Sequence, residues 1–425
     1  MSALDSSRAT LSTSFRALRH RNFRFYWSGQ LISLIGTWMQ SVAQGWLMHR
    51  LTSSAFMLGL LTFITFLPVL FFALWAGVII DRVDKRKLLL VTQSLMLLQA
   101  TSLALVVSAG IVQPWMVLAL AFFGGVVNTF DLPARQSFVI EMVGREDLSN
   151  GIALNSAAFN VARILGPAVA GVLLASIGES GCFWLNALSF IAVLVGLWRI
   201  KLKHVPNTDT RSTGSTLRDG VAYAWGIPSI RTLLVLLAIC AGLGFQYNVL
   251  LPVYTRDLLH AGPRTYGALL AAFGLGSLLA AAQMTRPQDR WALRRNLLTG
   301  LTAGGVGFAA FAWIHWLPAM MASGFVAGYG LILYVSSTNV LIQMTTEDRY
   351  RGRVMSLYTL MFVGTAPIGG LLAGAIAQRF GAPVSTSLCA LLLLGGAFWV
   401  SVRLRAIAAR EEVSARAEQE PESAA

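Results

Sequence analysis

The chain has 425 residues, of which 56% are hydrophobic and only 12% carry a charge. An average soluble protein has roughly 25% charged residues, so this composition excludes an ordinary soluble globule of this size. The net charge of +14 would point to nucleic acid in a soluble protein. Here the basic residues follow a membrane pattern instead, and we expect no nucleic-acid partner.

The apolar residues come in blocks of about twenty, the length that crosses a hydrocarbon core of about 30 Å as a helix. The three cysteines lie inside such blocks without metal-ligand spacing, so we expect buried free thiols and no metal site. The pattern predicts an all-α membrane protein with twelve transmembrane helices. In chain order they are expected at residues 25–47, 57–80, 88–109, 115–143, 149–177, 183–202, 230–254, 266–284, 297–315, 317–344, 354–377 and 384–402.

Lysines and arginines, 33 in all, fall almost entirely in alternate segments between these blocks. The opposite segments hold only Arg50, Arg256, Arg264 and Arg379. Because basic residues stay on the cytoplasmic side, we expect a multi-pass protein of the inner (plasma) membrane with both termini in the cytoplasm.

The longest internal loop follows the sixth block and divides the chain into two halves that resemble repeats. Gly36 and Gly244 are 208 positions apart, as are Gly59 and Gly267. These equal intervals indicate two pseudo-symmetric six-helix bundles with a binding site between them at mid-membrane. The expected parts are an N-terminal tail (1–21), a first bundle (22–203), a linker (204–228), a second bundle (229–404) and a C-terminal tail (405–425) that is disordered or a frayed helix.

The loop after the second block reads Gly77-Val-Ile-Ile-Asp81-Arg82-Val-Asp84-Lys-Arg-Lys87. It resembles the G-x-x-x-D-R-x-G-R-K motif of the major facilitator superfamily, with Asp84 in place of the usual glycine. In that superfamily the loop latches the two halves on the cytoplasmic side. The resemblance implies close helix approach at the glycine, a helix cap from the first aspartate, and basic residues that pair with an acid of the fourth span. An ordinary basic loop is the alternative. The candidate latch residues are Gly77, Asp81, Arg82, Lys85, Arg86 and Glu141.

The fifth block contains Gly166, Pro167 and Gly171 in an arrangement similar to the G-x-x-x-G-P-x-x-G-G motif of antiporter members of the superfamily. These residues predict a tight, bendable helix contact, and plain close packing would explain them equally. The fourth block has Ala121 and Gly125 where many proton-linked members have the ends of R-x-x-Q-G. The missing arginine argues against the standard proton-coupling scheme.

The stretch from Asn128 through Asp131 and Arg135 to Arg163 is similar to the branch called transmembrane secretion effectors, which includes siderophore exporters and multidrug efflux proteins. The resemblance implies a secondary transporter that exports a small, often amphipathic molecule by alternating access. No P-loop appears, so proton antiport is the expected driving reaction, without a cofactor. The expected partners are a small-molecule substrate, protons and membrane lipid, and the expected state is a monomer.

Polar side chains recur at every third or fourth position of the first block, which places them on one helix face. Amides are costly in lipid, so this face should meet either a water-filled cavity or another helix through hydrogen bonds. The seventh block, its repeat mate, is also polar. The candidate substrate residues on the two blocks are Gln30, Thr37, Gln40, Gln44, Gln246 and Asn248.

Asp131 and Arg163 are charged residues inside expected spans, which makes them functional candidates. A rise of 1.5 Å per residue places them at similar depth on consecutive helices, so they are expected to form a coupling pair. In that pair Asp131 is the first candidate proton carrier. Two alternatives remain: Asp131 pairs with Arg135 one turn away, or Arg163 donates to backbone carbonyls.

Three other functions compete with export. A nutrient importer of the same fold typically carries several buried charges, which are scarce here. A receptor or scaffold without transport would have a recognisable signalling domain. An enzyme would need a metal cluster or a nucleophile constellation, and the sequence contains neither.

Overall fold

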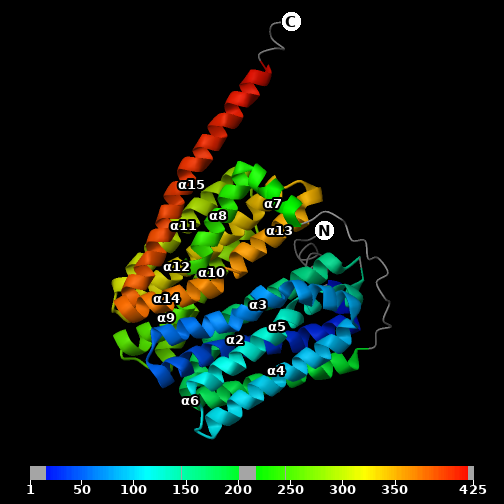
Figure 1. Ribbon diagram of the computed structural model, residues 1–425, viewed down its shortest axis with the longest axis vertical. Coiled ribbons are helices and arrows are strands. Elements are labelled where there is room, and N and C mark those ends of the chain that lie inside the picture. The colour runs from blue at the N-terminus through cyan, green and yellow to red at the C-terminus, as the bar shows by residue number, and fades with distance from the viewer. Residues whose placement is uncertain (1–15, 145, 201–216, 245, 420–425) are drawn as a thin grey trace, which may run out of the picture. The chain divides into compact units, whose positions relative to one another are not determined.

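A computed structural model describes residues 16–144, 146–200, 217–244 and 246–419. Within these residues all regular secondary structure is helical, and short connections join the helices (Figure 1). In chain order the elements are η1 (Arg16–Arg19), α2 (Arg21–Thr52), α3 (Ala55–Arg82), α4 (Lys85–Ser108), α5 (Pro114–Val143), α6 (Leu148–Arg199), α7 (Leu217–Gly226), α8 (Pro228–Gly244), α9 (Tyr247–Val253), the π-helical turn η2 (Tyr254–Leu258), α10 (Pro263–Met284), α11 (Arg290–Trp313), α12 (Leu317–Thr345), α13 (Asp348–Val363), α14 (Ala366–Phe380) and α15 (Ala382–Gln419).

Local sequence signals mark several helix ends. The Ser54 hydroxyl accepts a hydrogen bond from the amide of Met57 at the start of α3, and the Asp84 carboxylate accepts one from Lys87 at the start of α4. These side chains satisfy backbone donors that a helix start leaves open. Gly144 follows α5 with a φ of 73°, a conformation that glycine adopts without strain.

Eight helices in the described residues are long and apolar enough to cross a membrane, or nine if the bent pair of α7 and α8 counts as one span. The helices follow the expected apolar blocks, but they divide the chain differently. The block at 149–177 and the part of the block at 183–202 up to Arg199 lie in α6, where Gly178 with a φ of 71° breaks the helical conformation. The block at 354–377 is split between α13 and α14.

The chain forms two compact units. Unit 1 comprises the described residues of Met1–Arg211 and Thr255–Ala271, and unit 2 those of Ser212–Tyr254 and Ala272–Ala425. Thr255–Ala271 was expected in the second bundle, yet it packs with the first. One reason is the close contact of Gly267 with Gly171 of α6, where a side chain on either residue would collide with the other's backbone.

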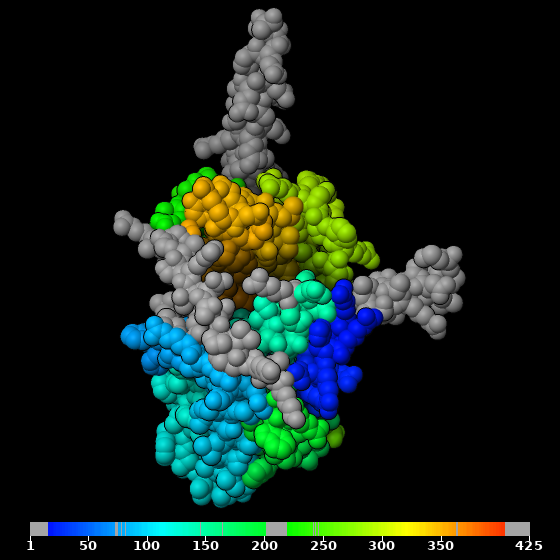
Figure 2. Space-filling view, turned by 90° about the vertical axis from the view of Figure 1, so that its right-hand side faces the viewer, coloured from blue at the N-terminus to red at the C-terminus, as the bar shows by residue number. Residues whose placement is uncertain are grey.

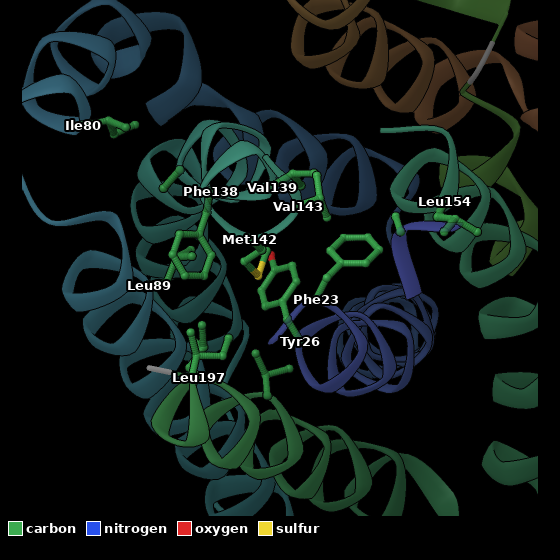
Figure 3. Packing of buried hydrophobic residues seen from close by; sticks show 14 of the residues in the cluster. Phe23, Tyr26, Ile80, Leu89, Phe138, Val139, Met142, Val143, Leu154 and Leu197 are labelled. Atoms are coloured by element: carbon green, nitrogen blue, oxygen red, sulfur yellow. The ribbon is translucent and has the colours of Figure 1, made fainter. Parts of the chain in front are cut away.

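Unit 1 is built from α2–α6, with α2 and α4 against α6 and α3 against α5. Its main apolar cluster gathers where the start of α2 meets the ends of α5 and α6 (Figure 3). Tyr26 and Phe138 meet there edge to face, with ring centroids 5.9 Å apart, a favourable geometry for aromatic pairs. The surface of α4, light blue in Figure 2, covers one side of the unit.

Unit 2 packs α11 against α12 and α15, and α8 against α15. Its aromatic core contains Phe273, whose ring stacks on Tyr247 at a centroid distance of 4.3 Å and meets Phe308 and Phe311. The three cysteines are buried and free, as expected. The expected C-terminal tail begins within α15, which continues to Gln419.

Candidate functional site

A buried ion pair lies inside unit 1, on α5. Asp131 is fully buried and pairs with Arg135, one helical turn away, whose side chain is 12% exposed. The neighbouring helix α4 adds two donors to the Asp131 carboxylate: the Thr92 hydroxyl at 2.6 Å and the Gln93 amide at 2.7 Å. Hydrogen bonds to an ionised acceptor are stronger than neutral ones. The Asp131 carboxylate therefore has an ionic partner on its own helix and two hydrogen-bond donors on α4.

The apolar surroundings of this pair include Tyr26 on α2. Its hydroxyl is buried and has no hydrogen-bond partner among the described residues. The Tyr26 side chain lies among Phe138, Met142 and Leu197 in Figure 3. An aromatic hydroxyl without a partner near two charges is a polar group that could enter a rearranged network.

The structure therefore places Asp131 in the arrangement that the sequence left as the alternative, with Arg135 as its ionic partner. The polar partners that the structure gives it come from α4 and α5. Arg163 lies on α6 and is half-buried. Thr92 and Gln93 were missed, because a sequence reveals which residues share a helix face but not which neighbouring helix that face meets.

The polar face of α2 separates into two environments. Gln40 donates to the Gln99 side chain of α4 at 2.9 Å and accepts from the Asn186 amide of α6 at 2.7 Å. Thr37, by contrast, is exposed, and its hydroxyl donates to the Ser33 carbonyl of the same helix. Gln40 thus joins three helices by hydrogen bonds, the alternative to a cavity-lining role.

Two other glutamines of α2 keep unused hydrogen-bonding capacity. Gln30 is 1% exposed, and neither its amide nitrogen nor its amide oxygen has a partner in the described residues. The amide nitrogen of Gln44 is likewise buried without one. Buried polar groups are normally satisfied, so these side chains are the best-placed members of the polar face for contact with a polar ligand group.

In unit 2, the Gln246 amide donates to the Gly242 carbonyl at 2.7 Å and to the Ala366 carbonyl at 3.3 Å. It holds the start of α9 to α8 and α14. Asn248, two residues further on, is exposed. The two expected candidates of the seventh block therefore have different surroundings.

The basic loop between α3 and α4 binds within unit 1. The Lys85 ammonium lies 2.7 Å from the Glu141 carboxylate of α5. The Arg86 guanidinium donates to the carbonyls of Leu197 and Trp198 at the end of α6, both at 2.9 Å. These bonds satisfy carbonyls that the helix end leaves open. The loop thus ties together three helices of one bundle.

Other members of the expected latch have fewer contacts. Arg82 is exposed, and the side chain of Asp81 lies outside the described residues. The close helix approach expected at Gly77 is not present, because a Cβ on Gly77 would meet no described atom within 4 Å. The close contacts occur instead in the motif of α6, where Gly166 packs against the backbone and Trp38 of α2 and Pro167 is buried beside it.

A polar contact in unit 1 that was not predicted from the sequence joins α2 to η2. The buried His49 imidazole lies 2.9 Å from the half-exposed carboxylate of Asp257. These residues are 208 positions apart, the same interval that relates Gly36 to Gly244. That interval was the available signal. Across the described residues no cluster of His, Cys, Asp or Glu could hold a metal ion.

Comparison with known proteins places this arrangement in a family. The sequence profile described as transmembrane secretion effector matches residues 12–425. The multidrug efflux pump Tap of Mycolicibacterium fortuitum is 26% identical, over 81% of this chain and 87% of the relative. The staphyloferrin A transporter of Staphylococcus aureus is 25% identical, over 84% of this chain and 90% of the relative.

The fold is similar to that of solved transporters. The nucleoside transporter NupG has a TM-score of 0.74 at 13% identity and covers 90% of this chain and 99% of its own. A bacterial homologue of the lysosomal transporter Spinster, inward-facing and unoccupied, has a TM-score of 0.71 at 14% identity, with coverages of 91% and 97%. At such identity the likeness concerns the fold alone. The match over nearly the whole chain shows that this protein belongs to the transmembrane secretion effector family of the major facilitator superfamily.

Proposed function

We propose that the chain is a secondary active transporter that exports a small amphipathic molecule, such as a drug, a siderophore or a secondary metabolite. The observation that carries this proposal is the family match over residues 12–425, together with relatives named as a multidrug efflux pump and a siderophore transporter. The family and these relatives are transporters rather than enzymes. The protein would work by alternating access of two six-helix bundles in the plasma membrane.

The composition of the buried polar groups fits an amphipathic substrate. Gln30 and Gln44 offer neutral amides with unused hydrogen-bonding capacity. Asp131 is already compensated by Arg135, so the pair adds no net charge to the bundle interior. Weakly polar groups in an apolar setting accept many amphipathic molecules, whereas a charged nutrient would call for a fixed counter-charge.

Proton antiport would use the Asp131–Arg135 pair. A proton bound by Asp131 removes the negative charge and leaves the Arg135 cation without its partner inside the bundle. An uncompensated charge there is costly, so protonation would favour a rearrangement that gives Arg135 water or a new acceptor. Release of the proton would restore the pair. Arg163 on the neighbouring span is the second candidate for interaction with the substrate.

The test compares efflux of ethidium, a labelled macrolide and a labelled iron-free siderophore from cells with and without the protein. We expect export of at least one probe, abolished by a protonophore and unaffected by ATP depletion alone. Asp131→Asn should abolish uphill export but retain exchange down a substrate gradient. Asp348→Asn is the matched control, because Asp348 is a highly exposed carboxylate of α13.

Two results would count against this proposal. Equal retention of all probes with and without the protein contradicts export of this substrate class. Uphill export that persists in Asp131→Asn, with unchanged substrate-induced proton release from the purified protein, shows that the proton is carried by another group.

A further inference from the structure

Unit 2 contains a polar hollow at the turn between α10 and α11. It has a volume of about 410 Å³ and opens to the outside of the unit. Its lining combines two guanidinium groups, three side-chain amides and one leucine, at Arg286, Arg295, Gln283, Gln288, Asn296 and Leu279. The surface of this part of the chain is lime-coloured in Figure 2. This lining is rich in hydrogen-bond donors, as an anion site requires.

The two arginines of the hollow have no carboxylate partner within 4 Å in the described part of the chain. Arg349 and Arg351, by contrast, pair with Glu347 and Asp348 at the start of α13. Arg295 lies over the ring of Trp291, 4.9 Å from its centroid. The acid nearest in sequence, Asp289, accepts a hydrogen bond from the Ala292 amide at 2.6 Å as the cap of α11. The positive charge of the hollow is therefore available to a ligand.

The amide side chains of the lining, which form its floor, are hydrogen-bonded to one another. Asn296 is 4% exposed and is hydrogen-bonded to Gln283 at 3.3 Å and to Gln288 at 3.2 Å. The Tyr329 hydroxyl of α12 donates a hydrogen bond to the side-chain amide oxygen of Gln283 at 2.6 Å. Because these contacts hold the floor in one arrangement, a ligand would not have to order it.

An apolar strip leads away from the hollow along α10. Leu279 lines the hollow, and Leu275 and Leu278 follow on the same helix; these three side chains are each about half exposed. Trp291, at the start of α11 and in contact with Arg295, is 67% exposed, and tryptophan favours the level of lipid headgroups. The hollow thus offers a cationic end and an apolar end, matching a molecule with a phosphate head and hydrocarbon tails.

We infer that this hollow binds a phosphate group, and that the group belongs to an anionic phospholipid whose chains lie along the leucines of α10. Arg286 and Arg295 are its charged ligands. Basic pockets at the end of a helix bundle are suited to such headgroups. The inference needs unit 2 to lie in a membrane, as the proposed function also does, but it does not need the protein to export anything.

The test uses the purified full-length protein in detergent, freed of lipid and titrated with phosphatidylglycerol or phosphatidylcholine, with bound lipid counted by native mass spectrometry. We expect tighter retention of phosphatidylglycerol. The variant Arg286→Gln/Arg295→Gln should weaken it by roughly 30-fold, from about 5-fold for each arginine near an anionic lipid. The variant Arg349→Gln/Arg351→Gln removes the same charge from paired, exposed sites and should change it less than 3-fold.

A second titration arm adds inorganic phosphate at constant ionic strength. Phosphate that displaces phosphatidylglycerol only at high concentration supports the lipid as ligand. If inorganic phosphate binds without lipid, and the Arg286→Gln/Arg295→Gln variant no longer binds it, the hollow is a phosphate site for a soluble ligand and the lipid is excluded. Equal phosphatidylglycerol retention by the two double variants, both with unchanged thermal unfolding, overturns the site. This test contains no efflux measurement, so a negative result would contradict the lipid site and leave the transport proposal unaffected.

Discussion

Gln40 is the residue whose structural surroundings most sharply separate helix packing from substrate binding. Its amide accepts from Asn186 and donates to Gln99, and so bridges α2, α4 and α6. Gln40→Leu keeps a side chain of similar size but removes both hydrogen bonds. It leaves the Asn186 amide and the Gln99 carbonyl oxygen to find new partners in a buried place.

The magnitude follows from hydrogen bonds between helices in membranes, which average about 0.6 kcal/mol and reach about 1.7 kcal/mol. Two lost bonds amount to about 1–3 kcal/mol in the free energy of unfolding. Because the partners left behind are buried, and an unsatisfied buried group is costly, we expect the upper part of this range, about 2–3 kcal/mol. If Gln40 only holds helices together, the affinity for exported probes should change less than 3-fold.

The assay is reversible unfolding of the purified protein in mixed micelles, alongside probe binding. Thr37→Val is the control, since its exposed hydroxyl donates only within α2, and it should shift stability by less than about 0.5 kcal/mol. The double variant Gln40→Leu/Asn186→Leu should lose less than the sum of the single variants, because both remove one shared bond. The packing role would be refuted if Gln40→Leu lost probe affinity tenfold while its free energy of unfolding stayed equal to that of Thr37→Val.

Three further expectations concern other parts of the chain. Gly171→Ala should greatly lower the yield of folded protein, because its Cβ would collide with the backbone of Gly267, whereas Gly77→Ala should be neutral in size-exclusion and thermal assays because nothing lies near. Lys85→Met should lower stability by about 1 kcal/mol through loss of its partly buried partner Glu141, while a stability equal to wild type would remove the ion pair from the account of this loop. A membrane-impermeant maleimide should label Gly262→Cys in intact cells but Gly352→Cys only after permeabilisation; both sites have open space for the new side chain, and the reverse result would invert the proposed topology.

Much of the helical structure could be predicted from the sequence, because apolar length and end signals act locally. Residues 57–80 and 115–143 were expected as helices, and α3 and α5 contain them. Breaks were harder to predict. Gly178 turns the chain through one positive-φ residue while helix continues on both sides. A new helix, α14, begins at Ala366, with Pro367 in its first turn, inside what was expected to be a single span.

Periodicity predicted which residues share a face of α2, but not what that face meets. Thr37 and Gln40 belong to the same polar stripe, yet the first is exposed and the second is buried between two helices. The same limit applies to Asp131: its partner one turn away could be predicted from spacing, whereas Thr92 and Gln93 depend on the rotation of α4 against α5. Contacts between helices require the three-dimensional arrangement, which helical spacing does not contain.

The contact of His49 with Asp257 bears on the proposed repeat. Equivalent positions in two parallel repeats are related by a pseudo-twofold axis, so they can touch only where that axis passes close to both. His49 and Asp257 differ by the same 208 positions as Gly59 and Gly267, and their side chains are 2.9 Å apart. Both residues belong to unit 1, so the contact ties the end of α2 to the turn η2 within that unit, and the two-bundle repeat stays a prediction.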